Sequence, residues 1–244
     1  MSHKEYFRNH IFDFTPFLGK EILAFTTDAS IDFALSSSAP FLSFAQRDLF
    51  KDQSQSSWSK VFNIRQVHGN KIVIATAKLY KESNAIVQAD GIVTQDADVP
   101  IAVRTADCLP VFMYDPKQKV VAITHAGWRS THKRIVEGTL KKMKSKFKTR
   151  PQDVKIAFGP GLRSCCYVVT DEFLKYFPQE TKRQGDHLVF DLALANRRQL
   201  LSAGVLARNI FDAKMCTFCT QKCYSHRRDQ ERAGRMLSVI MLKG

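Results

Sequence analysis

A series of short, strongly β-forming segments fills the middle of the chain and limits the folds that it can adopt. The segments are rich in Val, Ile and Thr, and turn-forming pairs such as Asp115-Pro116 separate them. Short β-branched runs bounded by turn residues are typical of strands. We therefore predict strands over residues 71–77, 89–94, 100–104, 110–114 and 119–124.

Helical patterns follow these strands. Val136, Leu140, Met143 and Phe147 recur at spacings of four, three and four, which is typical of the buried face of an amphipathic helix. Further along the chain we expect a strand at 154–158, helices at 171–177 and 192–202, and final elements at 223–228 and 236–242. The strands and helices alternate without a regular βαβ rhythm, so we predict an α/β fold, a single domain with a mixed β-sheet flanked by helices.

Length and composition exclude several other classes of protein. With 244 residues, of which 44% are hydrophobic, the chain can bury a core, so it is neither disordered nor dependent on disulfides. No apolar run approaches the roughly 20 residues of a membrane span. The first 20 residues lack the apolar core of a signal peptide. We expect a soluble, cytoplasmic protein without a membrane partner, whose six cysteines are reduced thiols.

The formal net charge of +14 raises the possibility of a polyanion partner. Much of this charge lies in residues 129–150, which hold nine Lys or Arg residues against Glu137 alone. The basic residues fall opposite the apolar face of the predicted helix, and no aromatic residues lie among the lysines to stack on bases. A solvated cationic face is therefore favoured over nucleic-acid binding.

Three short sequence blocks place a His or Cys at the end of a predicted strand. They contain His68, Cys108 and His125, in the sequences QVHG, TADCLP and THAGWR. Side chains at strand ends are held rigidly and still reach a crevice. Two imidazoles and one thiolate suit zinc, and three protein ligands leave a fourth position open. Spacing alone leaves a second interpretation open, in which each residue is simply packed.

The remaining cysteines form two further groups. Cys216 and Cys219 have the spacing of a zinc knuckle, Cys223 follows four residues later, and His226 is a candidate for the fourth ligand that a structural zinc needs. Because the surrounding sequence is strand-like, buried free thiols are the favoured interpretation. The adjacent residues 165 and 166 are both cysteines. In an extended chain their side chains point to opposite faces, so we expect them to serve packing.

The order and separation of these blocks resemble a known family. The matching blocks are QVHG, ADGIVT, TADCLP, HAGWR, FGPGLRSCCYVV, FDL, CTFC and YSHRRD. They resemble the laccase-domain or YfiH-type family, once called polyphenol oxidases and now described as purine nucleoside phosphorylases with adenosine deaminase activity. The resemblance begins near residue 62 and implies one catalytic domain over 1–244, with 1–60 as its divergent N-terminal part. It also implies a fold similar to that of the cytotoxic-necrotising-factor type of cysteine hydrolase.

The resemblance implies one catalytic zinc ion held by His68, Cys108 and His125. The implied reactions are phosphorolysis of adenosine, inosine and methylthioadenosine to a base and a ribose or methylthioribose 1-phosphate, and deamination of adenosine. Deamination requires a carboxylate that moves a proton, and Asp107 and Asp90 are the candidates. Phosphorolysis requires cations at the phosphate, and arginine matches phosphate oxygens best. The candidates are Arg129, Arg227, Arg228 and Arg163.

Three departures and three alternatives accompany this hypothesis. Residues 25–31 and 35–40 differ from the family pattern, and Val168 replaces a common Glu. One alternative is a hydrolase or amidase with Cys108 as nucleophile and His125 as base. Another is weak polyphenol oxidation with copper, although no His-X-His pair exists for a copper cluster. The third is a polyanion binder that uses the basic helix.

Overall fold

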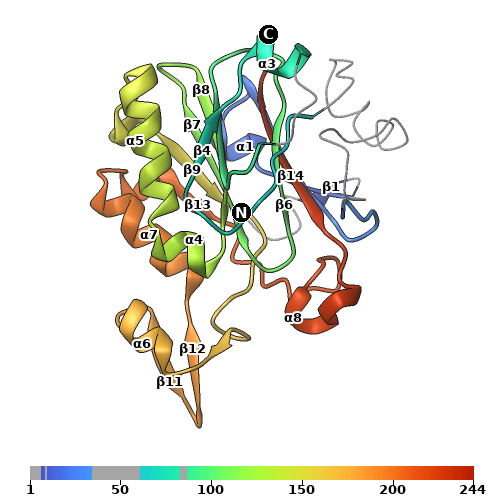
Figure 1. Cartoon of the computed structure of the whole chain (residues 1–244), viewed down its shortest axis with the longest axis vertical. Coiled ribbons are helices and arrows are strands. Elements are labelled where there is room, and N and C mark those ends of the chain that lie inside the picture. The colour runs from blue at the N-terminus through green and yellow to red at the C-terminus, as the bar shows by residue number, and fades with distance from the viewer. Residues whose placement is uncertain (1–6, 9, 35–60, 83–86) are drawn as a thin grey trace.

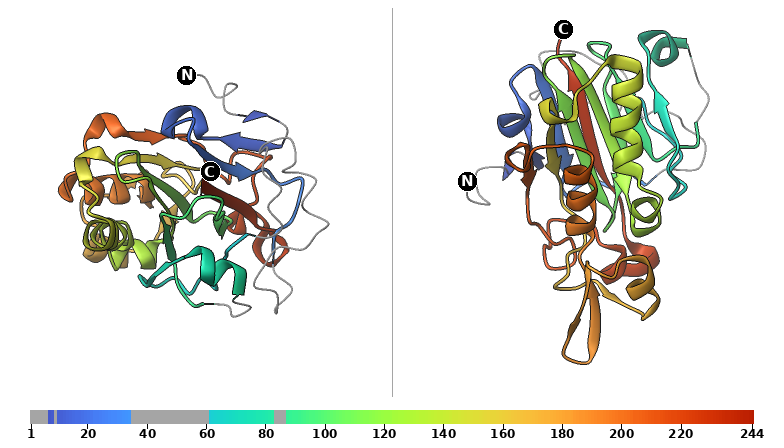
Figure 2. Two further views of the ribbon diagram at one scale, coloured as in Figure 1. Left: turned by 90° about the horizontal axis from the view of Figure 1, so that it is seen from above. Right: turned by 90° about the vertical axis from the view of Figure 1, so that its left-hand side faces the viewer.

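A computed structural model of the chain describes residues 7–8, 10–34, 61–82 and 87–244. The family departure at residues 35–40 lies outside these residues. The described residues form three sheets and their flanking helices (Figure 1). The two larger sheets pack face to face, and helices cover the outer face of one of them (Figure 2).

The six-stranded sheet is mixed, as predicted. Its strands run in the order β13-β9-β7-β8-β5-β4. β9 pairs with β13 and β4 with β5 in parallel, and the other pairs are antiparallel. The two central strands, β7 and β8, are buried along their whole length, because both faces of the sheet are covered. The bounds are β4 Ile72–Ile74, β5 Gly91–Thr94, β7 Leu109–Asp115, β8 Val120–Ala126, β9 Lys155–Phe158 and β13 Ile210–Asp212.

The five-stranded sheet is antiparallel in every pair and runs in the order β1-β2-β3-β14-β6. Between it and the six-stranded sheet lies an apolar core to which Phe14, Phe112, Ile123 and Ile240 belong. The strand β14 lies between β3 and β6 and pairs with both of them. The bounds are β1 Phe7–Arg8, β2 Ile11–Asp13, β3 Ile22–Thr27, β6 Ile101–Thr105 and β14 Met236–Leu242.

A second core lies between the six-stranded sheet and the helices α5, Ile135–Phe147, and α7, Leu192–Ser202. Val136, Leu140 and Met143 are buried in it, which confirms the predicted apolar face. The basic segment is however not one helix. A short helix α4, Trp128–His132, precedes α5, and Arg134 between them has a φ of 59°. This left-handed residue turns the chain, so the lysines of α5 lie on a helix separate from the HAGWR block.

Smaller elements complete the described chain. A three-stranded sheet, β10-β12-β11, projects with α6 from one end of the molecule (Figure 1). The bounds are β10 Val168–Val169, β11 Thr181–Gln184, β12 His187–Phe190 and the helices α1 Thr15–Leu18, α3 Ala77–Glu82, α6 Glu172–Tyr176 and α8 His226–Asp229. Three short 3₁₀ helices lie at Pro151–Asp153, Ala207–Asn209 and Gln230–Arg232.

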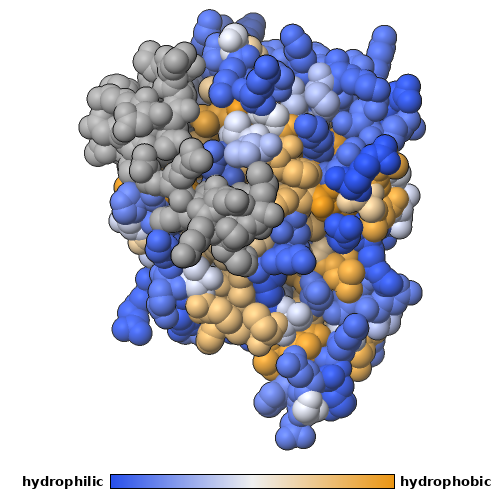
Figure 3. Space-filling model, turned by 180° about the vertical axis from the view of Figure 1, so that it is seen from behind, coloured by the Kyte–Doolittle hydropathy of each residue, from blue (hydrophilic) through white to orange (hydrophobic). Residues whose placement is uncertain are grey.

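The surface of the described residues differs in hydropathy from one region to another. Seen from behind, the described surface is mostly hydrophilic, with hydrophobic residues gathered near its middle (Figure 3). None of the helices in the described residues has the length and apolar character needed to cross a membrane.

The packing of α5 gives a stability prediction. We expect Leu140→Ala to lower the free energy of unfolding by about 2–5 kcal/mol, because the buried leucine leaves a cavity. The matched control Lys144→Ala, on the exposed face of the same helix, should change it by less than about 0.5 kcal/mol. Urea unfolding followed by circular dichroism measures both. Equal effects would contradict the assigned buried face.

Candidate metal centre

The site begins at the end of β8, where His125 lies opposite a buried carboxylate. Asp90 directly precedes β5, the antiparallel neighbour of β8. The backbone N–H of His125 donates to the carbonyl of Asp90 at 2.8 Å. The His125 Nδ1 lies 2.9 Å from Asp90 Oδ1, and both residues are almost fully buried. Because Nδ1 is bound to the carboxylate, the other ring nitrogen, Nε2, is left for a ligand.

The same carboxylate holds the loop that carries His68. The backbone N–H groups of Val67, His68 and Gly69 donate to Asp90 at 3.2, 2.9 and 2.7 Å. His68 itself has a φ of 54°, a left-handed conformation that these three hydrogen bonds stabilise. Burial acts to raise the pKa of Asp90, but the hydrogen bonds from His125, Gly69 and Val67 lower it overall.

Cys108 completes the group from the short connection between β6 and β7. Its Sγ lies 3.9 Å from Nε2 of His68. One ligand atom from each of His68, Cys108 and His125 lies within 4.8 Å of the others. Gly127 makes this approach possible, since a Cβ there would lie 2.9 Å from the sulfur of Cys108. The fold therefore gathers the three residues that the strand-end argument selected.

The charges in this group are strongly coupled. Burial acts to raise the pKa of Cys108, but His125 and His68 lower it to about 6. Burial acts to lower the pKa of His125, but the Cys108 thiolate and Asp90 raise it to about 9. At neutral pH the protein without a metal therefore holds a thiolate beside an imidazolium. A thiolate and two imidazoles are a donor set that zinc accepts, and zinc would take the place of the imidazolium proton.

A cavity of about 710 Å³ opens in front of the group. His68, Cys108 and His125 all line it. Among the described residues, two acidic ones, Asp107 and Glu231, also line it. The described lining also includes five arginines, namely Arg65, Arg104, Arg129, Arg227 and Arg235. Five guanidinium groups against two carboxylates give this described part of the lining a positive potential suited to an anionic ligand.

Two of the four arginines proposed from the sequence reach this cavity. Arg129 lies at the start of α4 with its guanidinium 4.3 Å from the ring centroid of Trp128. Arg227 lies at the start of α8, with its guanidinium 5.5 Å from the ring centroid of Tyr167. Both residues are exposed and available to a ligand.

The other two arginines make structural contacts instead. Arg163 forms an ion pair with Asp212 at 2.8 Å and donates to backbone carbonyls. Arg228 forms an ion pair with Asp229 at 2.8 Å and donates to the carbonyls of residues 217, 218 and 223. Neither is among the described residues that line the cavity, so the structure offers no reason to keep them as phosphate ligands.

The two candidate carboxylates also differ in position. All four hydrogen bonds to Asp90 come from backbone or His125 behind the site, and Asp90 is absent from the cavity lining among the described residues. Asp107 lines the cavity beside Cys108, with a φ of 87°. Its carboxylate accepts from the hydroxyl of Thr217 and the backbone N–H of Arg227, each at 2.6 Å. Asp107 is thus the carboxylate placed to meet a ligand.

Sequence reasoning missed several lining residues. Burial and the nearby charge of Arg235 lower the pKa of Arg104 to about 10, and within the described structure the buried Nη1 of Arg104 has no hydrogen-bond partner. Tyr167 is buried beside Cys108, and burial is the main reason that its pKa is raised. Both adjoin motif blocks, since Arg104 precedes TADC and Tyr167 follows the two cysteines, and that adjacency was the available signal.

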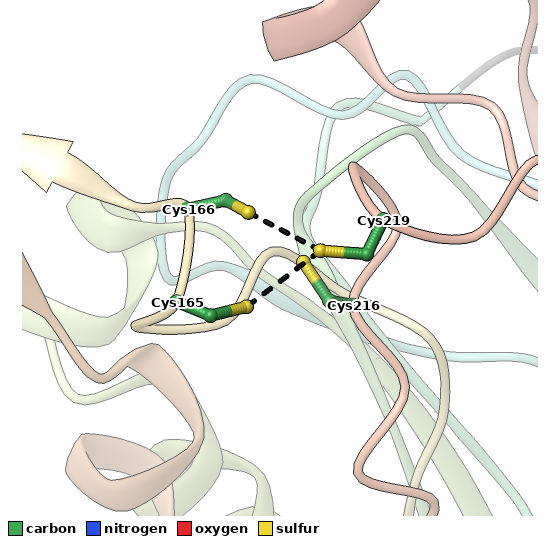
Figure 4. A group of neighbouring side chains, drawn as sticks. All are labelled: Cys165, Cys166, Cys216 and Cys219. Atoms are coloured by element: carbon green, nitrogen blue, oxygen red, sulfur yellow. Dashed lines mark hydrogen bonds between the residues drawn. The ribbon is translucent and has the colours of Figure 1, made fainter.

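The structure corrects the expectations for the other cysteines. Cys165 and Cys166 do not point to opposite faces, because both sulfurs lie close to those of Cys216 and Cys219 (Figure 4). Cys216 is buried as expected, but Cys219 is exposed. Cys223 is buried and its thiol contacts Met215 Sδ at 3.8 Å. His226 lines the main cavity instead, so neither residue joins a knuckle with Cys216.

The sequence also matches a described protein family. The family model described as multi-copper polyphenol oxidoreductase laccase covers residues 44–243. The chain belongs to this family. The purine nucleoside phosphorylase YlmD of Bacillus subtilis is 33% identical over 210 residues, which cover 80% of this chain and 74% of YlmD. The adenosine deaminase RL5, from an unknown prokaryotic organism, is 30% identical over 194 residues, or 73% of this chain and 74% of RL5.

A solved structure of another family member confirms the fold. The crystal structure of YlmD from Geobacillus stearothermophilus aligns with a TM-score of 0.79 and 28% sequence identity. The alignment covers 94% of each chain. The predicted single α/β domain with mixed sheet and flanking helices is therefore confirmed.

The coupled charges give a prediction for the protein without metal. We expect the rate at which iodoacetamide alkylates Cys108 to rise with pH and to reach half its maximum near the pKa of this thiol. The thiolate is the reactive form, and the pKa of Cys108 is lowered to about 6. Peptide mass spectrometry after chelation measures the rate at Cys108 separately from the other thiols. The control Cys223, whose pKa burial raises to about 12, should stay unreacted. A midpoint near 9 at Cys108 would contradict the described charge coupling.

Proposed function

We propose that this protein is a zinc-dependent purine nucleoside phosphorylase that also deaminates adenosine. Adenosine, inosine and methylthioadenosine are the proposed nucleosides, and inorganic phosphate is the second substrate. The names of the relatives support the purine nucleoside class. The phosphate is supported by the arginine-lined cavity, which adjoins the His68, Cys108 and His125 group.

The observation that carries the proposal is the unbalanced positive charge of the cavity. Arg104 supports this point most strongly, because the Nη1 atom of its guanidinium is buried and has no hydrogen-bond partner among the described residues. A buried donor without a partner costs free energy that a bound oxyanion would recover. Arg235 raises this cost further, since its charge already disfavours the charged form of Arg104. An anion with several oxygens fits both guanidinium groups.

The donor set fits zinc at the candidate metal centre. Zinc, when bound by His68, Cys108 and His125, would supply a Lewis acid at the wall of the cavity. Asp90 keeps Nδ1 of His125 occupied and so presents Nε2 to the centre. Copper is the metal in the family description, but a single mixed site of nitrogen and sulfur ligands with an open position is typical of catalytic zinc.

The chain's own groups divide the work of phosphorolysis. Arg104, Arg129 and Arg227 would hold the phosphate so that one oxygen faces the anomeric carbon of the ribose. As the glycosidic bond breaks, the departing purine gains negative charge and needs a proton. Asp107 lines the cavity. We propose that it takes the proton from the O–H of the attacking dihydrogen phosphate, whose oxygen bonds to the ribose, and passes it to the departing purine. Tyr167 also lines the cavity, where its ring would offer the base an aromatic surface to pack against.

A second candidate function rests on the Cys108 and His125 pair. The lowered pKa of Cys108, to about 6, and the raised pKa of His125, to about 9, describe an activated nucleophile beside a protonated partner. Such a pair also serves a hydrolase or amidase without metal. Activity that survives complete metal removal would favour this candidate and would overturn the zinc-dependent one.

The central test is product analysis with and without phosphate. Protein of measured metal content is incubated with adenosine, inosine and methylthioadenosine, and the products are separated by chromatography. We expect free base to appear only when phosphate is present, and inosine to form from adenosine without it. Removing zinc with a chelator should abolish both reactions, and adding zinc back should restore them. Neither product from any of the three nucleosides would contradict the proposal.

Substitution of Arg104 tests the phosphate pocket. We expect Arg104→Ala to raise the KM for phosphate about 10- to 100-fold, because a charge-assisted hydrogen bond contributes about 1.5–3 kcal/mol, while the KM for the nucleoside changes little. Arg104→Lys keeps the charge and should recover part of the loss. The control Lys146→Gln removes a cation from the exposed face of α5 and should leave both constants unchanged. An unchanged KM for phosphate in Arg104→Ala would remove Arg104 from the phosphate site.

A further inference from the structure

The four cysteines outside the candidate metal centre form a compact group. Cys165, Cys166, Cys216 and Cys219 each place a sulfur within 4.8 Å of the other three. Two pairs come from loops about fifty residues apart in the sequence, and Figure 4 shows their sulfurs converging on a common point. The Sγ of Cys219 lies 3.9 Å from that of Cys165 and 3.3 Å from that of Cys166.

The fold explains why these loops meet. β9 and β13 are parallel neighbours, so the loops that follow them begin at the same end of the two strands. The loops also bond to each other directly. The N–H of Gly161 donates to the carbonyl of Met215, and the N–H of Thr217 donates back to the carbonyl of Gly161, each at 3.2 Å. The convergence of the thiols is thus built into the sheet topology.

From this geometry we infer that Cys165, Cys166, Cys216 and Cys219 bind a second zinc ion, as a closed four-thiolate site. Zinc–sulfur bonds of about 2.3 Å in a tetrahedron place the sulfurs about 3.8 Å apart. The two separations given above lie on either side of this value. Four protein ligands leave no open position, so the ion has a structural role and adds none to the reaction.

The surroundings of the group match those of a structural zinc site. The backbone N–H groups of Cys219, Arg163 and Phe218 lie near the sulfur of Cys216, as outer contacts to a thiolate ligand do. The guanidinium of Arg163 bridges the two loops by donating to the carbonyls of Met215 and Gly159. This accounts for the position of Arg163 away from the main cavity.

The site connects to the candidate metal centre through one residue. Thr217 lies between the ligands Cys216 and Cys219, and its hydroxyl donates to Asp107 at 2.6 Å. Asp107 lines the main cavity. A zinc ion that fixes this loop therefore fixes the carboxylate that we propose as the proton carrier, although the inference about the second zinc rests on the thiol geometry alone.

The test measures metal in a protein that lacks the first site. The background variant His68→Ala/Cys108→Ala removes two ligands of the candidate metal centre. It is purified in the presence of a thiol reductant from cells grown with added zinc. Its zinc and iron contents are measured by inductively coupled plasma mass spectrometry. We expect one zinc ion per chain in the background and none once Cys165→Ala/Cys166→Ala is added. The matched control Cys223→Ala removes a thiol outside the group and should keep the zinc.

A second measurement covers the case in which the added variants fold poorly. Cobalt is titrated into the chelated background variant, which keeps all four thiols. We expect saturation at one ion per chain, with a thiolate-to-cobalt charge-transfer band of the intensity that four sulfur ligands give, and displacement of the band by zinc. Zinc should also raise the Tm of this variant.

Three outcomes would overturn the inference. They are a background variant without stoichiometric metal, iron in place of zinc, and a disulfide between Cys166 and Cys219 in the reduced preparation. Each is independent of nucleoside turnover, so failure here and failure of the proposed function are distinguishable.

Discussion

One buried carboxylate organises the candidate metal centre. Asp90 accepts the Nδ1–H of His125 and the backbone N–H groups of the loop that holds His68. A buried carboxylate is costly unless every oxygen finds a donor, and here four donors satisfy it. This one group therefore fixes a strand end and a loop from distant parts of the sequence, and it sets which nitrogen of His125 faces the centre. Without it, the ring of His125 loses its Nδ1 partner and the His68 loop loses three backbone hydrogen bonds.

The sequence predicted the parts of the structure that depend on local pattern. The apolar face of α5 and the strands β7 and β8 follow from periodicity and from β-branched runs, and the strand-end argument selected His68, Cys108 and His125, which the fold brings together. The sequence did not predict features that depend on backbone conformation at a single residue or on which strands pair. Arg134 adopts a left-handed conformation that splits the basic segment into two helices. The pairing of parallel strands β9 and β13, which no local pattern reveals, brings Cys165 and Cys166 to Cys216 and Cys219.

In the structure, most of the described arginines at the cavity lie outside the segment in which basic residues cluster in the sequence. The four lysines of α5 supply only part of the surplus, and they lie on the outer side of a helix apart from the site. The arginines that line the cavity come from scattered positions, among them Arg65, Arg104 and Arg235. The proximity of Arg104 and Arg235 follows from the pairing of β6 with β14, which sets Met236 opposite Thr105. Net charge and its clustering along the sequence were therefore poor guides to where the arginines of the cavity gather.

The metal affinity of an Asp90→Asn variant tests the account most directly. The amide keeps the size of the side chain but loses the charge that orients His125. Zinc affinity is measured by competition with a chelator, in a Cys165→Ala/Cys166→Ala background so that only the candidate metal centre binds. The account predicts about 10- to 100-fold weaker binding, whereas Asp153→Asn, which removes a surface ion pair with Lys117, should have no effect. Unchanged affinity in Asp90→Asn would contradict the central role of this carboxylate.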